Sequence, residues 1–184
     1  MRDELEQRLE RDFPFMKRDR NGEESLYQKW GCECDNGWFD LIHELCQKIS
    51  DRFERDGKEP NIIVLQIKEK FAALRFYYKF EGSKDSIQAL DFLDSGISIR
   101  FSPGENNSDR ADDETAALRK DIRRLVNEYE QKSKTVCEVC GALGEVRTNM
   151  PWIRTLCESC HLKRIKINEE TMKKRAADKA SKQS

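Results

Sequence analysis

The chain has 184 residues, of which 38% are charged and 37% hydrophobic, and its formal net charge is -1. This length fits one compact domain with a small added module. The composition excludes a membrane-embedded protein, because the longest nearly pure apolar run, residues 62–67, has six residues and a spanning helix needs about 20. The first eleven residues carry seven charges and no apolar block, so we expect no signal or transit peptide and a cytoplasmic location.

Charge is unevenly distributed along the chain. Residues 1–136 carry a formal charge of -5 and residues 137–184 a charge of +4. The basic excess is concentrated after residue 162, where eight Lys or Arg face three acids. This segment favours attraction to phosphate or to an acidic protein face. A solvated terminal helix or a frayed end is the alternative interpretation.

Two helices are predicted in the first half of the chain. Apolar residues every four positions from Leu5 to Phe13 predict a short helix that ends before Pro14, since proline disfavours a helical residue in front of it. A longer apolar stripe at helical spacing runs from Trp38 to Phe53. Asp35 or Asn36 is placed to cap its start.

Alternating apolar residues next predict a β-hairpin with its turn around residues 68–72. The alternating residues are Ile63, Leu65 and Ile67 in the first strand and Leu74, Phe76, Tyr78 and Phe80 in the second. A short helix at Ile87, Leu90 and Leu93 follows, and residues 97–101 predict a third strand that gives the hairpin a further partner. Residues 1–101 therefore form the predicted α+β domain, with helices packed on a small antiparallel sheet.

A change of composition separates this domain from the rest. Residues 102–116 are acidic and lack large apolar side chains, which predicts a linker or loop. Its acids at 112–114 offer oxygen ligands to a hard cation, but a solvated loop is the preferred interpretation. Residues 117–136 carry one apolar stripe and predict a connecting helix that runs toward a module at 137–165 and a basic tail at 166–184. The stripe consists of Leu118, Ile122, Leu125, Val126 and Tyr129.

Two Cys-x-x-Cys pairs form the strongest motif. Cys137 and Cys140 are separated from Cys157 and Cys160 by sixteen residues, a spacing typical of a four-cysteine zinc site. Gly141 allows the turn that lets the first pair bend back on one ion. The residues after the second pair have helical character, so the predicted order is knuckle, hairpin and helix, a treble-clef order. We expect one structural Zn²⁺ held by four thiolates.

The seven cysteines and two histidines also allow other ligand sets and pairings. His161 adjoins Cys160 and is an alternative fourth ligand. Disulfides are disfavoured because nothing in the sequence indicates secretion. Cys32, Cys34, His43 and Cys46 offer a second metal site, since His43 and Cys46 share a helical face. The preferred interpretation places Cys46 in the core and the other two cysteines in a loop.

Residues 155–163 carry a resemblance to a known family. No phosphate-binding glycine loop and no Gly-x-Ser-x-Gly motif occurs in the chain. The run Thr-Leu-Cys-Glu-Ser-Cys-His-Leu-Lys resembles the closing segment of HNH endonucleases, which implies a zinc-supported treble clef with His161 as the last metal-binding histidine. The family's general base lies between the cysteine pairs, where residues 141–156 contain no histidine. The resemblance thus implies that the zinc module shares the treble-clef fold of these endonucleases but lacks the residue needed to cleave DNA. An HNH-like endonuclease is therefore the least favoured alternative.

A longer resemblance is to uncharacterised proteins of bacteriophages and prophages. It is carried by Gly37-Trp38-Phe39-Asp40-Leu41-Ile42 with Leu45-Cys46, by residues 68–71 with 74–77, and by residues 137–141 with 152–157. The family's short glycine-rich turn before the tryptophan is replaced here by residues 148–151. The resemblance implies a phage or bacterial cytoplasmic setting and brings no activity with it.

Together these features predict a non-enzymatic, zinc-stabilised binding protein. If the partner is a protein, we expect Trp152 and Ile153 to form an apolar anchor that is surrounded by a rim of basic side chains. If the partner is DNA or RNA, we expect these basic side chains to contact phosphates and Trp152 to stack on a base. The rim residues are Arg147, Arg154, Lys163, Arg164 and Lys166. The net negative charge and a pI near 6.2 favour a bacterial host protein, as an adaptor or an inhibitor of a defence enzyme. A structural alternative has Trp152 filling the gap between module and domain.

Overall fold

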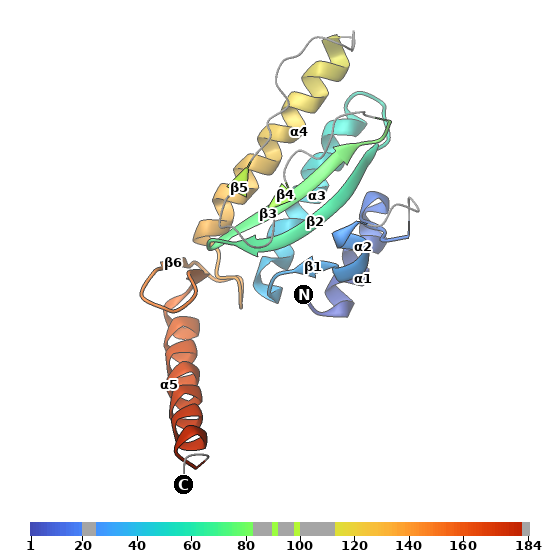
Figure 1. Ribbon diagram of the computed structural model, residues 1–184. Coiled ribbons are helices and arrows are strands. Elements are labelled where there is room, and N and C mark those ends of the chain that lie inside the picture. The colour runs from blue at the N-terminus through green and yellow to red at the C-terminus, as the bar shows by residue number, and fades with distance from the viewer. Residues whose placement is uncertain (20–24, 83–89, 92–97, 100–112, 182–184) are drawn as a thin grey trace.

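The computed structural model describes residues 1–19, 25–82, 90–91, 98–99 and 113–181 (Figure 1). It is an α+β fold with a small mixed sheet, followed by a hairpin and a long helix, which confirms the predicted fold class. The α-helices are α1 (Asp3–Asp12), α2 (Leu26–Trp30), α3 (Phe39–Glu54), α4 (Asp113–Lys132) and α5 (Glu158–Ser181). The 3-10 helices are η1 (Pro14–Met16), η2 (Asn36–Trp38) and η3 (Ser133–Thr135). The strands are β1 (Cys32–Glu33), β2 (Ile62–Lys70), β3 (Ala73–Phe80), β4 (Leu90–Asp91), β5 (Ser98–Ile99), β6 (Glu145–Arg147) and β7 (Arg154–Leu156).

The predicted hairpin is confirmed, with longer strands and a tighter turn. Strands β2 and β3 pair antiparallel from Ile62 opposite Phe80 to Lys70 opposite Ala73. Only Phe71 and Ala72 join them, and both have positive φ, at 52° and 61°. Two left-handed residues in a two-residue connection are typical of the hairpin turn that matches strand twist.

The burial pattern agrees with the prediction in β3 and differs in β2. Leu74, Phe76, Tyr78 and Phe80 are all buried, as predicted for the second strand. In β2 the buried apolar residues are Ile62, Val64 and Ile67, whereas Ile63 and Leu65 are half-buried. The register shifts between Val64 and Gln66, so this irregularity breaks the simple alternation on which the prediction rested.

The third strand of the main sheet was predicted at the wrong place. Strand β1 pairs parallel with β2, Cys32 opposite Ile67, and gives the sheet order β1-β2-β3. Ser98–Ile99, in the segment predicted to join the hairpin, pairs with Leu90–Asp91 instead, so Leu90 lies in a strand and not in the predicted helix. The rest of both predicted segments lies outside the described residues. A two-residue strand such as β1 is too short to show an alternating pattern.

Helices α1, α3 and α4 pack around the main sheet and complete the core. Helix α1 ends at Asp12, as predicted, and α3 buries its apolar stripe. The predicted cap of α3 was wrong, because η2 leads into the helix and no side chain caps it. Helices α4 and η3 cover the outer edge of β3, where Glu130 Oε1 of α4 accepts from Phe76 N at 3.1 Å and Ser133 Oγ of η3 accepts from Leu74 N at 2.8 Å. These side chains satisfy backbone groups that an open strand edge would expose.

The predicted segment boundaries in the second half differ from the observed ones. Helix α4 begins at Asp113, inside the predicted linker, and ends at Lys132, before η3. Residues 102–112 of that linker lie outside the described residues. Helix α5 continues without a break through the predicted start of the basic tail and projects away from the rest of the molecule (Figure 1). No helix in the described part of the chain has the length and apolar character to span a bilayer.

Candidate metal centre and the adjoining groove

The predicted order of knuckle, hairpin and helix is confirmed. In the knuckle, Gly141 N donates to Cys137 O at 2.8 Å, and Cys137 N donates to Ala142 O at 2.7 Å. Gly141 has a φ of 78°, a left-handed conformation that glycine adopts without steric cost. Strands β6 and β7 then return the chain to Cys157 and Cys160, which lie at the start of α5.

All four cysteines meet in one cluster. The sulfur atoms of Cys137, Cys140, Cys157 and Cys160 lie within 4.8 Å of one another, and Cys140 Sγ is 3.6 Å from Cys157 Sγ. In a tetrahedral zinc site with bonds of about 2.3 Å, neighbouring sulfurs are roughly 3.8 Å apart. The donor set and the spacing therefore fit one zinc ion with a closed shell.

The thiols of this cluster differ in acidity before any metal is considered. Hydrogen bonds from the Ser159 hydroxyl and the Cys160 amide lower the pKa of Cys157 to about 6. Burial, together with the neighbouring Cys157 thiol, raises the pKa of Cys160 to about 12. Packing four thiolates together is unfavourable without a cation, and a bound divalent ion would supply the compensating charge.

His161 is not part of the cluster. Its ring is buried, with Nδ1 3.1 Å from Met150 Sδ, and its backbone N donates to Cys157 O at 2.9 Å. The sulfur of Cys160 faces the other three thiols instead. The alternative in which His161 replaces Cys160 as the fourth ligand finds no support in this geometry.

The alternative second metal site also finds no support. Within the described ranges, the cluster at 137–160 is the only group of three or more metal-ligating side chains close enough to share an ion. His43 Nε2 lies 3.1 Å from Asp12 Oδ2. Cys46 is a buried core thiol whose pKa is raised by burial, and burial also raises the pKa of Cys34 to about 12. Cys32, predicted in a loop, lies in β1.

The knuckle packs against the start of α3. Gly37 N donates to Glu138 O at 2.7 Å, and Trp38 Nε1 donates to Val136 O at 2.8 Å. A Cβ added at Gly37 would lie 2.3 Å from Cys137 O, so a side chain cannot fit there. The zinc module thus begins on a surface built by the first domain, and Trp38 is fully buried beneath it.

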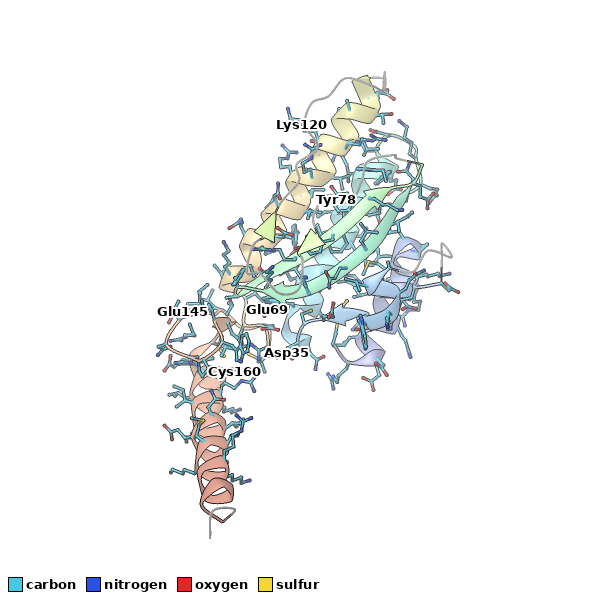
Figure 2. The ribbon with its side chains drawn as sticks, in the orientation of Figure 1. Asp35, Glu69, Tyr78, Lys120, Glu145 and Cys160 are labelled. Atoms are coloured by element: carbon cyan, nitrogen blue, oxygen red, sulfur yellow. The ribbon has the colours of Figure 1, made fainter. Side chains whose placement is uncertain are left out.

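Arg154, predicted to contact a partner, holds this junction together. Its guanidinium Nη2 lies 2.6 Å from Asp35 Oδ2 and 2.7 Å from Glu138 Oε2, and its side chain is 14% exposed. Figure 2 places Asp35 where the domain meets the module. Thr155 Oγ1 adds a bond to Ala72 O at 2.7 Å, at the hairpin turn. Arg147 pairs with Glu145 and Glu158 at 2.8 Å each.

A groove of about 1060 Å³ lies between the β2–β3 turn, the loop before β7 and one face of α5. Trp152 is 81% exposed and Phe71 57% exposed at its lip, so the structural alternative in which Trp152 fills the gap between module and domain finds no support. Ile153, Arg154 and Arg164 also line it, whereas Lys163 and Lys166 lie on other faces of α5. The remaining lining residues include Lys70, Met150, Pro151, Asn168, Met172 and Arg175.

Three segments that are distant in the sequence meet at this site. Gly37 and Trp38 contact the knuckle, Ala72 lies beside β7, and residues 152–157 form the lip of the groove and end at the first cysteine of the second pair. No family model, curated protein or solved structure matches this chain. The geometry of this chain alone therefore supports the metal centre and the groove.

Proposed function

We propose that this protein is a non-enzymatic binding protein in which zinc holds a docking groove for a segment of a partner protein. The observation that carries this proposal is the exposed ring of Trp152 at the lip of a groove in which six of the thirteen lining residues are apolar. Large exposed apolar patches on a folded protein are typical of interaction sites. A tryptophan in such a patch is the side chain most often found to dominate binding energy.

The ion has a structural role in this proposal. Four thiolates complete a tetrahedral shell and leave no position for water or substrate, as in structural zinc sites. The same four residues fix the two ends of the β6–β7 segment, which carries Trp152, to the start of α5. Zinc would therefore set the shape of two walls of the groove. The third wall, at Phe71, comes from the first domain.

The setting of the partner rests on the resemblance to phage and prophage proteins. In that setting the partner is a bacterial host protein, and the binding protein acts as an adaptor or as an inhibitor of a defence enzyme. Both roles need only a protein segment that buries Trp152.

Nucleic-acid binding is the second candidate. It is favoured by the cations on the outer faces of α5, where Lys163, Lys166, Lys173 and Lys174 are exposed. Contacts to phosphates would make affinity fall by about 0.9 log units per log of salt for each duplex phosphate neutralised. A steep salt response therefore belongs to the nucleic-acid candidate and a shallow one to the protein candidate.

A capture experiment tests the proposal. The full chain, loaded with zinc, is used as bait in bacterial lysate with and without nuclease, beside Trp152→Ala and Trp30→Ala. Trp30 is a matched control because it is also exposed, at 59%, but lies on α2 outside the groove. We expect a defined protein that survives nuclease, is lost with Trp152→Ala and is retained with Trp30→Ala. Capture that disappears with nuclease, or that ignores Trp152, would overturn the proposal.

A further inference from the structure

One face of α5 forms a continuous wall of the groove. The α5 residues that line it are Arg164, Asn168, Thr171, Met172 and Arg175. Their spacings of three and four residues put them on one side of the helix. Beyond its first turns α5 extends away from the domain, and Met172 is 66% exposed. Helices in proteins gain most of their stability from packing an apolar face, and this wall has no such partner within the described chain.

The charge along this wall is positive. Arg164 and Arg175 are eleven residues apart, which is three turns and about 16 Å on the same face. Neither makes an ion pair with another described residue. One acid, Glu69, also lines the groove at the hairpin turn, where its Oε1 accepts from Ala72 N at 2.7 Å, and the carboxylate of Glu138 pairs with Arg154. An occupant with carboxylates at the same separation would match the two arginines.

The opposite lip is built at a conformational cost. Phe71 has a φ of 52°, a left-handed conformation that is uncommon for a residue other than glycine. The turn is held by the Glu69 and Thr155 bonds to Ala72, and the result is an aromatic ring more than half exposed at the groove. Residues held in sparsely populated backbone conformations cluster at active sites and ligand clamps. Phe71 and Trp152 thus offer two rings to one occupant.

From these features we infer that the groove takes an acidic amphipathic helix of about three turns from the partner protein, an inference that rests on the proposed function. Its apolar face packs on Phe71, Trp152 and Met172, and carboxylates at its two ends meet Arg164 and Arg175. A helix suits this groove because one long wall is itself a helix. A partner strand cannot be added to the main sheet at β3 instead, because Glu130 and Ser133 already occupy the outer edge of that strand. The methionines, proline and isoleucine of the lining favour apolar side chains over stacked bases.

A displayed peptide library tests the inference. The library holds 14-residue helical peptides with a fixed apolar face, and with Glu, Gln or Lys varied at every polar position. Baits are the zinc-loaded full chain, Arg164→Gln/Arg175→Gln and Lys163→Gln/Lys174→Gln. The last is a matched control, because it removes two charges at the same separation on α5 from residues that do not line the groove. Elemental zinc and helical circular dichroism confirm that each bait is folded.

We expect the wild type and the control to enrich peptides with Glu near both ends. The best synthetic peptide should bind Arg164→Gln/Arg175→Gln about tenfold more weakly, by fluorescence anisotropy, and the control within about twofold. Selection of neutral or lysine-rich peptides, or an equal loss in both double variants, would overturn the inference. So would Trp152-dependent binding of a twelve-nucleotide oligothymidylate in the same assay, or concentration-dependent dimerisation that blocks peptide binding.

The two experiments distinguish a wrong occupant of the groove from a wrong docking function. If a protein is captured from lysate through Trp152 while the library selects no acidic helix, the docking function stands and the acidic-helix occupant is wrong. If neither experiment yields a Trp152-dependent partner, both are wrong.

Discussion

The first domain and the zinc module are stabilised in different ways. The domain has a continuous core of buried apolar side chains that runs from Leu9 to Tyr129 through the helices and the main sheet. The module contributes almost nothing to this core, and its Leu143 is 85% exposed. Of the module's apolar residues outside the cysteines, Leu156 is buried while Val139, Val146 and Ile153 remain exposed. We therefore expect the module to depend on the metal ion that its four cysteines fit and on its contacts with the domain, while its apolar side chains stay exposed.

The largest expected effect is loss of the metal. Structural zinc in small modules contributes on the order of 10–16 kcal/mol, and Cys157→Ser breaks the four-thiolate shell. We expect about one zinc per wild-type chain, none in Cys157→Ser, and protease sensitivity over residues 137–165, while residues 1–101 stay folded. Elemental analysis and limited proteolysis measure these outcomes.

A matched cysteine variant controls that experiment. Cys46→Ser alters a buried thiol outside the cluster, so it should keep the zinc and affect only core stability. Two zinc ions per wild-type chain, one of them lost in Cys46→Ser, would show that the second site at residues 32–46 exists.

The next effect concerns the ion pairs at the junction. Arg154→Met leaves the buried carboxylate of Glu138 without its cation, and breaking such a pair costs about 3–5 kcal/mol. Arg147→Met removes a guanidinium whose partners, Glu145 and Glu158, are mostly exposed, so its cost should stay within about 1 kcal/mol. Urea unfolding followed by tryptophan fluorescence separates the two. If both variants are equally stable and Arg154→Met alone loses the captured protein, Arg154 is the partner contact that the sequence predicted.

A smaller loss of stability is expected when a side chain is added at Gly37, where the domain contacts the knuckle. Gly37→Ala places a methyl group against Cys137 O and the neighbouring amides, and overpacking of this kind costs about 1–3 kcal/mol. Gly57→Ala is the comparison, because it has open space and loses only the ease of its left-handed backbone. Gly37→Ala should also weaken zinc retention against a chelator, and Gly57→Ala should not. Equal zinc retention in both would mean that the knuckle forms independently of the domain.

The sequence predicted the parts of this site that are local. Two cysteine pairs, a glycine after the first and a helix after the second determine the metal cluster within one stretch of the chain. Arg154 could not be assigned in this way, because its partner Asp35 is 119 residues distant and its charge looked equally suited to a surface. The groove was missed for the same reason, since the hairpin turn that forms one wall is distant in sequence from the loop and the helix that form the others. Phe71 gave one signal, a bulky residue in a predicted turn, but its exposure depends on the bonds that hold Ala72.

The smallest expected effect is an absence of nuclease activity with magnesium, manganese or zinc on single- or double-stranded DNA. Residues 141–156 lack the histidine that HNH endonucleases use as general base. The remaining candidate, His161, is buried against Met150 and has no open position from which to activate water. Mutating this histidine should therefore change stability and not catalysis. Cleavage that depends on added metal, persists through repeated purification and vanishes in His161→Ala would make the chain an enzyme, and the zinc module would then have to move His161 out of its buried position during turnover.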